Sequence, residues 1–401
     1  MLVCQGDLAG ASEKQALGYA TALGAAGHEV LLSLHGHARE AAREGAAVAG
    51  VRLSFRRHVG PRLARQTLAE ARAFAPDLIH AFNPRAAVMQ PSAQLADAVG
   101  SPVFVHWEDD EWSIRRGPDG RGLIRRVGRR GRRLLCHAHP PQGVFVTPAW
   151  LRWAVQNAAG FDALTPPLAE RVQSELGREC AVVLPVMPAI DWTRREPALK
   201  LPAHRPLAMF TGEIHPGSYD DVMLGLRALA LVQRRGISVA FAHVGTSLAR
   251  YDLQRMASEA GLQPGSAVAL GYVPFPELPP LLHRASILLQ PGRPIDFNRL
   301  RLPSKLQAYL ASGTPTITFA AGFAELLEDR REVLKTYGDQ PEELADRIAE
   351  LLTDPALRAA LSEGGPRAAA RLFDPASNAE ALVSHYESCL GAARPLALAS
   401  R

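Results

Sequence analysis

The chain has 401 residues and a net charge of +5, with 47% hydrophobic and 21% charged residues. This length allows two domains with separate cores, and the composition excludes a disordered chain. The four cysteines are scattered and form no CxxC pair, which predicts a protein of the reducing cytosol without a zinc site or a disulfide framework. The chain contains no apolar run of bilayer-spanning length, and it starts with a predicted strand, so we expect no secretory signal.

The first half of the chain alternates between buried strands and amphipathic helices. Strands are predicted over residues 1–5, 29–34, 51–55, 77–81 and 102–105, and helices over residues 12–26, 63–74 and 86–99, the first capped by Ser12. This alternation predicts a doubly wound parallel sheet. Because ligands of such sheets lie at the carboxyl ends of the strands, the loop that contains Gly10 is a candidate site; a simple tight turn explains this glycine equally well.

The strand over residues 102–105 runs into the sequence HWEDDEW, residues 106–112. Four acids and two tryptophans therefore follow the carboxyl end of a predicted parallel strand, where doubly wound folds bind ligands. We interpret Glu108 or Asp109 as a contact for a ligand hydroxyl group. The alternative is that they are solvated loop acids.

Residues 115–133 contain nine arginines and a single acid, Asp119. On a helical wheel the apolar residues of the segment 123–135 gather on one side and the arginines on the other, although Gly128 and Gly131 weaken a helix. An anionic membrane surface and an ordinary docked surface helix both fit this pattern. Nucleic acid is disfavoured because no aromatic residues are interleaved with the arginines.

The second half repeats the alternation after a proline- and charge-rich stretch, residues 186–206, which we interpret as a linker. A strand and helix over residues 161–176 and a short strand at 182–185 close the first domain. In the second domain, strands are predicted over residues 207–212, 239–244, 268–270, 285–290 and 316–319, and helices over residues 221–234, 248–260, 275–284, 342–352, 355–373 and 376–390.

The stretch 290–317, QPGRPIDFNRLRLPSKLQAYLASGTPTI, joins a strand, a basic loop, a helix and a further strand. Pro303 and Ser304 stand at the helix start, and Gly313 fits its C-terminal cap. Backbone N–H groups and the cations Arg301 and Lys305 would meet at the carboxyl edge of a strand. This arrangement predicts an anion site, with a diphosphate as the natural ligand.

The phrases FN-x-x-R-L-P-S-K-L and A-S-G-T-P-T-I resemble the donor-binding segment of GT-B glycosyltransferases similar to glycosyltransferase family 4. The resemblance implies two Rossmann-like domains facing a central cleft: an acceptor-side domain over residues 1–185, the linker 186–206, a nucleotide-sugar domain over residues 207–373, and a helix within residues 374–401 that returns to the first domain.

The resemblance also implies a function: metal-independent sugar transfer, with retention, from a nucleoside diphosphate sugar to a glycan or lipid-linked acceptor. It implies a role in polysaccharide biosynthesis and no cofactor. The cysteine pattern predicts a cytoplasmic location, and the segment 123–135 is compatible with a peripheral place at the inner membrane face and predicts no nucleic acid partner. Glu108 and Asp109 would serve the acceptor. The donor contacts would be Gly10, Gly212, His215, Arg293, Asn298, Arg301, Ser304, Lys305 and Gly313.

The donor segment departs from the family pattern. The loop after the first strand of the second domain reads EIHPGSY and lacks the usual Arg and Lys, and the two usual glutamates fall on Leu300 and Ala308. A variant site explains this if Arg293, Arg301 and Lys305 supply the charge, with Asp296 and Asn298 replacing the carboxylates. The alternatives are a catalytically silent GT-B module that binds a glycan, a lipid or a partner transferase, and a nucleotide-sugar epimerase.

Overall fold

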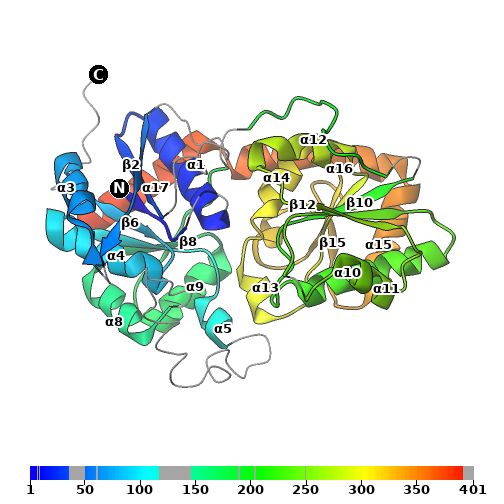
Figure 1. Cartoon of the computed structure of the whole chain (residues 1–401), viewed down its shortest axis with the longest axis horizontal. Helices are drawn as coiled ribbons and strands as arrows, with labels where there is room; N and C mark the ends of the chain where they lie inside the picture. The colour runs from blue at the N-terminus through cyan, green and yellow to red at the C-terminus, as the bar shows by residue number, and fades with distance from the viewer. Residues whose placement is uncertain are drawn as a thin grey trace. The chain divides into compact units, whose positions relative to one another are not determined.

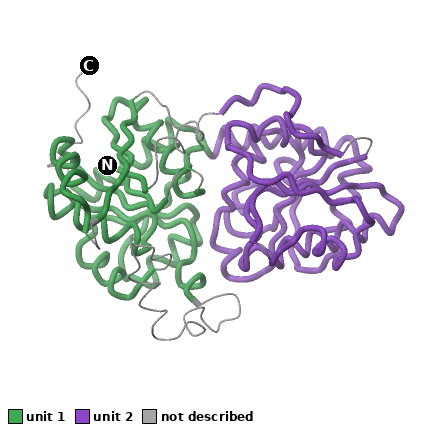
Figure 2. The backbone as a smooth tube through the Cα atoms, in the orientation of Figure 1, with its two compact units in different colours: residues 1–189, 373–401 green, residues 190–372 purple. Residues whose placement is uncertain are grey.

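The computed structural model describes residues 1–6, 8, 10–35, 50–59, 62–116, 146–187, 190–202, 205–248 and 250–391. The chain divides into two compact units (Figures 1 and 2). Unit 1 comprises residues 1–189 and 373–401, and unit 2 comprises residues 190–372. The first boundary lies inside the linker expected at residues 186–206. The segment 123–135, with its expected membrane surface, lies outside the described residues.

Unit 1 is built on a seven-stranded parallel sheet in the order β3-β2-β1-β6-β7-β8-β9. The strands are β1 (Leu2–Val3), β2 (Val30–Leu34), β3 (Val51–Phe55), β6 (Ile79–Phe82), β7 (Val103–Trp107), β8 (Ala158–Ala163) and β9 (Ala181–Val182), and β4 (His58–Val59) pairs with β5 (Arg62–Leu63). The helices are α1 (Ala11–Ala25), α3 (Arg65–Phe74), α4 (Ala86–Val99), α5 (Glu111–Arg116), α8 (Pro148–Asn157), α9 (Pro166–Leu176) and α17 (Pro375–Leu390).

The C-terminal helix α17 completes the core of unit 1. It contacts α1 and β8, and its Leu382 and Tyr386 share a buried cluster with Leu17 and Phe104. In sequence, α17 is nearly 200 residues away from the rest of this unit. Its apolar face binds it back onto unit 1. A side chain of α17 also binds the end of the first segment, since Asn378 Nδ2 donates to the carbonyl of Pro185 at 3.0 Å.

Unit 2 contains a six-stranded parallel sheet in the order β12-β11-β10-β13-β14-β15. The strands are β10 (Leu207–Thr211), β11 (Ala240–Val244), β12 (Ala267–Gly271), β13 (Ile287–Gln290), β14 (Thr316–Phe319) and β15 (Leu334–Thr336). The helices are α10 (Tyr219–Arg234), α11 (Leu253–Ala260), α12 (Leu278–Arg284), α13 (Asp296–Leu300), α14 (Lys305–Ser312), α15 (Pro341–Thr353) and α16 (Pro355–Leu372), with 3-10 turns η1 (Phe275–Glu277) and η2 (Gly322–Leu326).

Each sheet reverses its strand order at one point. In unit 1 the reversal lies between β1 and β6, and in unit 2 between β10 and β13. Doubly wound sheets bind ligands outside the carboxyl ends of the strands at such a reversal. The loops that begin at Cys4 and Asn83 in unit 1, and at Gly212 and Pro291 in unit 2, therefore surround the two candidate sites.

Several local predictions need correction. The helix predicted over residues 248–260 begins only at Leu253, because Asp252 caps it by accepting from the N–H of Arg255 at 2.8 Å. Ser12 is not a cap, since α1 begins at Ala11 with Gly10 as its N-cap residue. The strand β15 and the helices α5, α8 and α13 had not been predicted. Of these, β15, α5 and α13 are short.

Candidate functional site

In unit 2, the amine of Lys305 lies in a largely apolar setting at the start of α14. Its Nζ lies 4.0 Å from the centroid of the Phe210 ring, and the side chain is half-buried. Gly212 makes this position possible, because a Cβ there would lie 3.3 Å from Cε of Lys305 and the backbone φ is +114°. Burial lowers the pKa of Lys305 to about 7; Arg301 lowers it as well, whereas Asp221 raises it.

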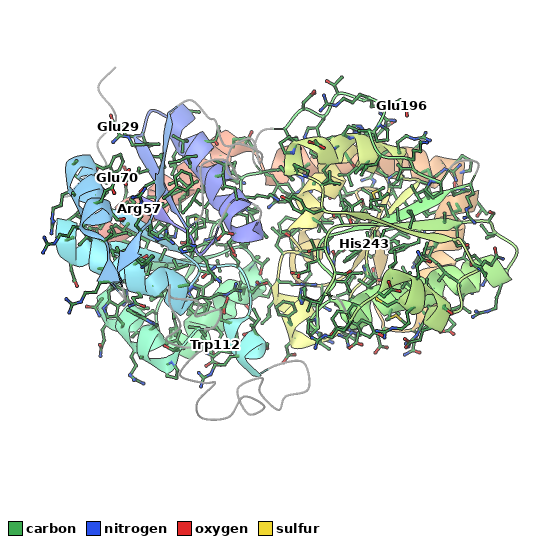
Figure 3. All side chains as sticks on the ribbon, viewed as in Figure 1. Glu29, Arg57, Glu70, Trp112, Glu196 and His243 are labelled. Atoms are coloured by element: carbon green, nitrogen blue, oxygen red, sulfur yellow. The ribbon has the colours of Figure 1, made fainter. Side chains whose placement is uncertain are left out.

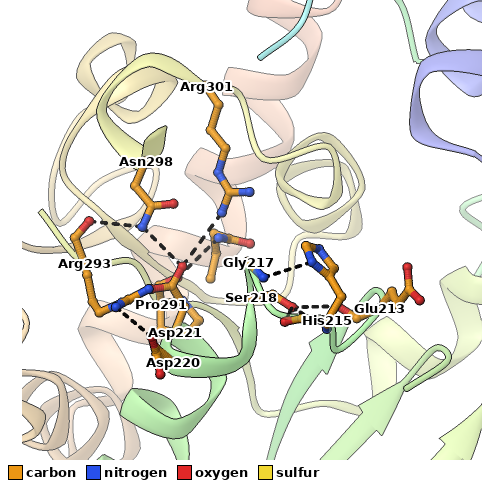
Figure 4. A network of polar contacts seen from close by, with 11 residues as sticks. Glu213, His215, Gly217, Ser218, Asp220, Asp221, Pro291, Arg293, Asn298 and Arg301 are labelled. Atoms are coloured by element: carbon orange, nitrogen blue, oxygen red, sulfur yellow. Dashed lines mark hydrogen bonds and ion pairs between the residues drawn. The ribbon is translucent and has the colours of Figure 1, made fainter. Parts of the chain in front are cut away.

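Asp221, in the first turn of α10, ties this helix to the loop that precedes α14 (Figure 4). Its buried carboxylate accepts from Nε of Arg293 at 2.8 Å and from Nδ2 of Asn298 at 3.2 Å, and Nη2 of Arg301 lies 4.0 Å away. Asp220, which is more exposed, pairs with Nη1 of Arg293 at 2.9 Å. The loop is therefore held in place by one carboxylate with three partners.

The loop after β10 is a hydrogen-bonded turn (Figure 4). His215 accepts through Nδ1 from the N–H of Gly217 at 3.1 Å, and Ser218 donates to the carbonyl of Glu213 at 2.9 Å. On the next strand, His243 (Figure 3) places Nε2 2.7 Å from the carbonyl oxygen of Gly212. Burial lowers the pKa of His243, so its neutral ring donates this bond and fixes the strand end next to Lys305.

In unit 1, Glu108 occupies the corresponding place at the carboxyl edge of the sheet. One of its carboxylate oxygens, Oε2, accepts from the hydroxyl of Ser12, and Nδ2 of Asn83 lies 3.4 Å from that hydroxyl. The other oxygen, Oε1, is buried and has no hydrogen-bond partner in the described part of the chain. Burial raises the pKa of Glu108 to about 7, against the lowering effect of His106 and Ser12.

Arg85 connects the acids that follow. Its Nε donates to Glu111 at 2.8 Å, and its Nη2 lies 3.5 Å from Asp109. Burial likewise raises the pKa of Glu111 to about 7. The short helix α5 that carries Glu111 is anchored by Trp112 (Figure 3), whose ring stacks on that of Trp107 at a centroid distance of 4.7 Å.

Comparison with known proteins relates unit 2 to a family. Residues 205–354, which lie within unit 2, match the family described as glycosyl transferases group 1. The two doubly wound parallel sheets give the chain the GT-B fold, which the solved structures described below share.

Known relatives of this GT-B chain include both curated sequences and solved structures. It is 30% identical over 256 residues to the 2-deoxystreptamine glucosyltransferase of Streptomyces kanamyceticus, covering 61% of this chain and 64% of the relative. It is also 30% identical over 201 residues to the D-inositol 3-phosphate glycosyltransferase of Thermobispora bispora, covering 48% and 45%. The chain thus spans less than two thirds of the length of either relative.

Two solved structures share the fold over nearly the whole chain. HepE of Anabaena, in complex with UDP and glucose, has a TM-score of 0.67 at 16% identity and covers 96% of this chain and 99% of its own. Sucrose-phosphate synthase of Thermosynechococcus elongatus has a TM-score of 0.60 at 16% identity, with coverages of 93% and 92%. At this identity the likeness establishes the fold alone.

The GT-B fold gathers most of the residues expected for the donor. Gly212, Arg301 and Lys305 lie together, with Arg293 and Asn298 joined to them through Asp221. Arg293 forms ion pairs with two carboxylates, and the exposed Asp296 has no ion pair among the residues that the structure describes. The diphosphate contacts stay predictions, and Lys305 and Arg301 are the residues whose geometry favours them.

Three expected site residues have a clear backbone role. Gly10 is the N-cap residue of α1, and Ser304 is the N-cap residue of α14 without a side-chain capping bond. Gly313 ends α14 with a φ of +67°, and a Cβ there would lie 3.1 Å from the carbonyl oxygen of Ser362 in α16. The helix end and the close approach of α16 account for this glycine without a ligand.

Sequence reasoning missed the residues that hold the predicted site residues in place. Asp221 lies at the start of a predicted helix, where an acid is explained by the helix dipole alone. Arg85 and Asn83 follow β6 in a loop that had not been considered. Ser12 had been interpreted as a cap, yet its hydroxyl binds Glu108. The position of all four at the carboxyl ends of the strands was the available signal.

Proposed function

We propose that the chain is a retaining, metal-independent glycosyltransferase that moves a sugar from a nucleoside diphosphate sugar to a glycan or lipid-linked acceptor. The observation that carries the proposal is the amine of Lys305 beside Gly212, at the carboxyl ends of the neighbouring strands β10 and β13. A diphosphate bound there would meet this amine, the Arg301 guanidinium and the first N–H groups of α14.

These groups support a mechanism without a metal ion. The diphosphate gains negative charge as the sugar departs, and prearranged cations and N–H groups stabilise that charge best when they need not move. Lys305 and Arg301 supply the cations. Asp221 is a carboxylate whose charge acts on Lys305, but its oxygens already accept from Arg293 and Asn298, so we assign it to the loop and not to a metal ion.

Glu108 is the proposed acceptor contact, with Asp109 beside it. With a pKa of about 7, the Glu108 carboxyl exists in both forms near neutral pH and can accept from or donate to a hydroxyl group. Its oxygen Oε1 has no hydrogen-bond partner in the described part of the chain. The two curated relatives are named for cyclitol acceptors, so we add cyclitols to the glycan and lipid-linked acceptors to be tested.

A role in polysaccharide biosynthesis at the inner face of a membrane is the finer part of the proposal. The polysaccharide role rests on the family resemblance, and the membrane location rests on the sequence of residues 123–135, whose arginines and leucines fit an anionic surface. None of the helices that the structure describes is long and apolar enough to cross a bilayer.

The first experiment is a thermal-shift panel with UDP, GDP, ADP and TDP, each with and without its sugar. UDP comes first because HepE, which shares the fold, is described with UDP-glucose. A shift for at least one nucleotide that Lys305→Ala abolishes and Lys200→Ala leaves intact supports the proposal, since Lys200 is an exposed lysine of the same unit. The absence of any shift would favour the silent GT-B module.

A further inference from the structure

A series of buried polar side chains crosses unit 1 beneath Glu108. The hydroxyl of Tyr386, on α17, lies 2.7 Å from Nδ1 of His80 on β6. Nε2 of His80 lies 2.9 Å from Oδ2 of Asp162 on β8, a close approach without a well-directed hydrogen bond. The other oxygen of Asp162 hydrogen-bonds Nδ1 of His106 on β7. The two histidines and Asp162 are fully buried, and Tyr386 nearly so.

The register of the sheet explains why these side chains meet. His106 and Asp162 are direct partners in the β7–β8 ladder, and Phe104, two residues earlier on β7, is paired with His80 on β6. Side chains alternate along a strand, so His106, His80 and Asp162 project from the same face of the sheet. Glu108 follows His106 by two residues and continues this row at the carboxyl edge.

The pKa values of the two histidines are shifted in opposite directions. Burial lowers the pKa of His80, so its ring is neutral, accepts the Tyr386 hydroxyl at Nδ1 and carries its proton on Nε2. Burial would also lower the pKa of His106, but the Asp162 carboxylate outweighs burial and the net direction is upward. The same contacts, His106 first, hold the pKa of Asp162 well below its usual range although burial opposes them. The Asp162 carboxylate thus favours the protonated form of the His106 ring.

We infer that His106 is a positioning residue for Glu108: as an imidazolium held by Asp162, it favours the ionised Glu108 carboxyl that accepts from Ser12. Tyr386 and His80 steady Asp162 from the opposite side, so the C-terminal helix is part of the arrangement. The role of His106 in sugar transfer rests on the proposed acceptor contact of Glu108. The charge coupling between His106 and Glu108 is independent of that proposed function.

The groups that face this pair come from several neighbouring elements. For His106 they are Asp162, His80 and Glu108, with the ring of Tyr19 from α1 at a centroid distance of 6.1 Å. For Glu108 they are His106, Ser12, Asp109 and Arg85, together with the thiol of Cys4 and the hydroxyl of Tyr19. The ligand atoms of His80, His106 and Asp162 lie within 4.8 Å of one another, a spacing that a metal ion also accepts. A metal-bound ring would be neutral, and the test below separates the two cases.

The first measurement is the ¹⁵N chemical shift of the His106 ring in the full chain labelled at histidine, assigned with His106→Asn. We expect both ring nitrogens of His106 to carry protons at pH 7.5, while the ring of His80 shows one neutral tautomer. A neutral His106 ring at pH 7.5, either free or bound to added Zn²⁺, would overturn the inference.

The second measurement tests the coupling from both sides. In glutamate labelled with ¹³C at the carboxyl carbon, the titration midpoint of Glu108 should rise by about one pH unit or more in His106→Asn, since an adjacent opposite charge is lost. Because coupling is reciprocal, the midpoint of His106 should fall by the same amount in Glu108→Gln. The second variant changes a residue at the sheet edge, so the test does not depend on a folded His106→Asn protein.

Glu111→Gln is the matched control. It removes another buried carboxyl of the same cluster that does not act on His106, and the His106 midpoint should stay where it is. Equal shifts in Glu108→Gln and Glu111→Gln, or none in either, would contradict a specific coupling. Neither measurement uses a donor or an acceptor, so a failure of the proposed transferase activity would be recognised separately from a failure of this inference.

Discussion

Lys305 is the residue on which the donor site depends most. If its ammonium group binds the diphosphate, Lys305→Ala should weaken nucleotide binding by about 1.5–3 kcal/mol, the range for a hydrogen bond to a charged group. This loss corresponds to roughly 10- to 150-fold in Kd. Calorimetric titration of UDP measures it, with Lys200→Ala as the exposed control. Equal affinities in wild type and Lys305→Ala would remove this residue from the site.

The lowered pKa of Lys305 gives the binding a pH dependence. The folded protein holds this pKa at about 7, against an ordinary value of 10.5, so between these values the unfolded chain binds more protons and stability rises with pH. A diphosphate favours the charged amine. Binding should therefore take up a proton above pH 7, and affinity should fall by up to about tenfold per pH unit.

Calorimetry in buffers of different ionisation enthalpy tests this at pH 8. Proton uptake should be present in the wild type and absent in Lys305→Ala. Uptake that persists in the variant would assign the titration to another group. An affinity that does not change between pH 7 and pH 9 would contradict the idea that the amine is neutral in the folded protein.

Asp221 and Asp220 are neighbours with different expected effects. Asp221→Asn removes the charge that holds Arg293 and Arg301, and we expect a loss of about 2 kcal/mol in the stability of unit 2, because charged hydrogen bonds of a buried group are lost. Asp220→Asn changes a half-exposed ion pair and should cost less than about 1 kcal/mol. Hydrogen exchange of the β10 and β13 amides measures both. Equal losses would mean that burial of Asp221 is unimportant.

At the scale of single elements, two helical glycines of unit 2 offer a direct comparison. A Cβ on Gly364 in α16 would lie 1.7 Å from the carbonyl oxygen of Arg331, a backbone atom, so Gly364→Ala should cost about 2–3 kcal/mol. A Cβ on Gly225 in α10 would meet only Pro291 at 3.6 Å, and Gly225→Ala should be neutral or stabilise by up to about 1 kcal/mol. Urea unfolding of the two variants measures both changes in stability. Similar stabilities of the two variants would contradict the close contact between Gly364 and Arg331.

The elements of this fold were predictable where they are long and periodic. Helices such as Ala86–Val99 and strands such as Val51–Phe55 have the predicted bounds because their apolar residues follow one clear period. The start of α14 followed from Pro303 and Ser304, and its end followed from Gly313. The short strand β15 (Leu334–Thr336) lacks such a pattern, and its place at the sheet edge is decided by its pairing with β14.

The partners within the candidate sites were not predictable, because they come from separate elements. Asp221 meets Arg293 across 72 positions of sequence, and His106 meets Asp162 across 56. Nothing in the local sequence of either acid indicates which cation lies beside it. Predicting these contacts requires the strand order, which composition and periodicity leave open. The anion site at Lys305 was predictable because its strand, loop and helix are contiguous.

At the scale of the whole molecule, residues 123–135 provide the proposed link to a membrane. Full-length protein should sediment with vesicles that contain anionic lipid, less so as salt is raised, and less again when Arg125, Arg126, Arg129 and Arg130 are changed to Glu. Neutral vesicles are the control. Equal sedimentation with neutral and anionic vesicles would refute electrostatic attraction as the cause.

The central claim is that this GT-B chain transfers sugar by using Lys305 in place of a metal ion. Its most direct test is the consumption of UDP-glucose, and of the other sugar nucleotides that bind, with glycan, lipid-linked and cyclitol acceptors, in EDTA and in added Mg²⁺ or Mn²⁺. We predict turnover in EDTA that Lys305→Ala reduces by at least the roughly tenfold loss expected in binding, while Lys200→Ala retains it. Turnover that vanishes in EDTA and returns with metal, or that survives unchanged in Lys305→Ala, would contradict the account.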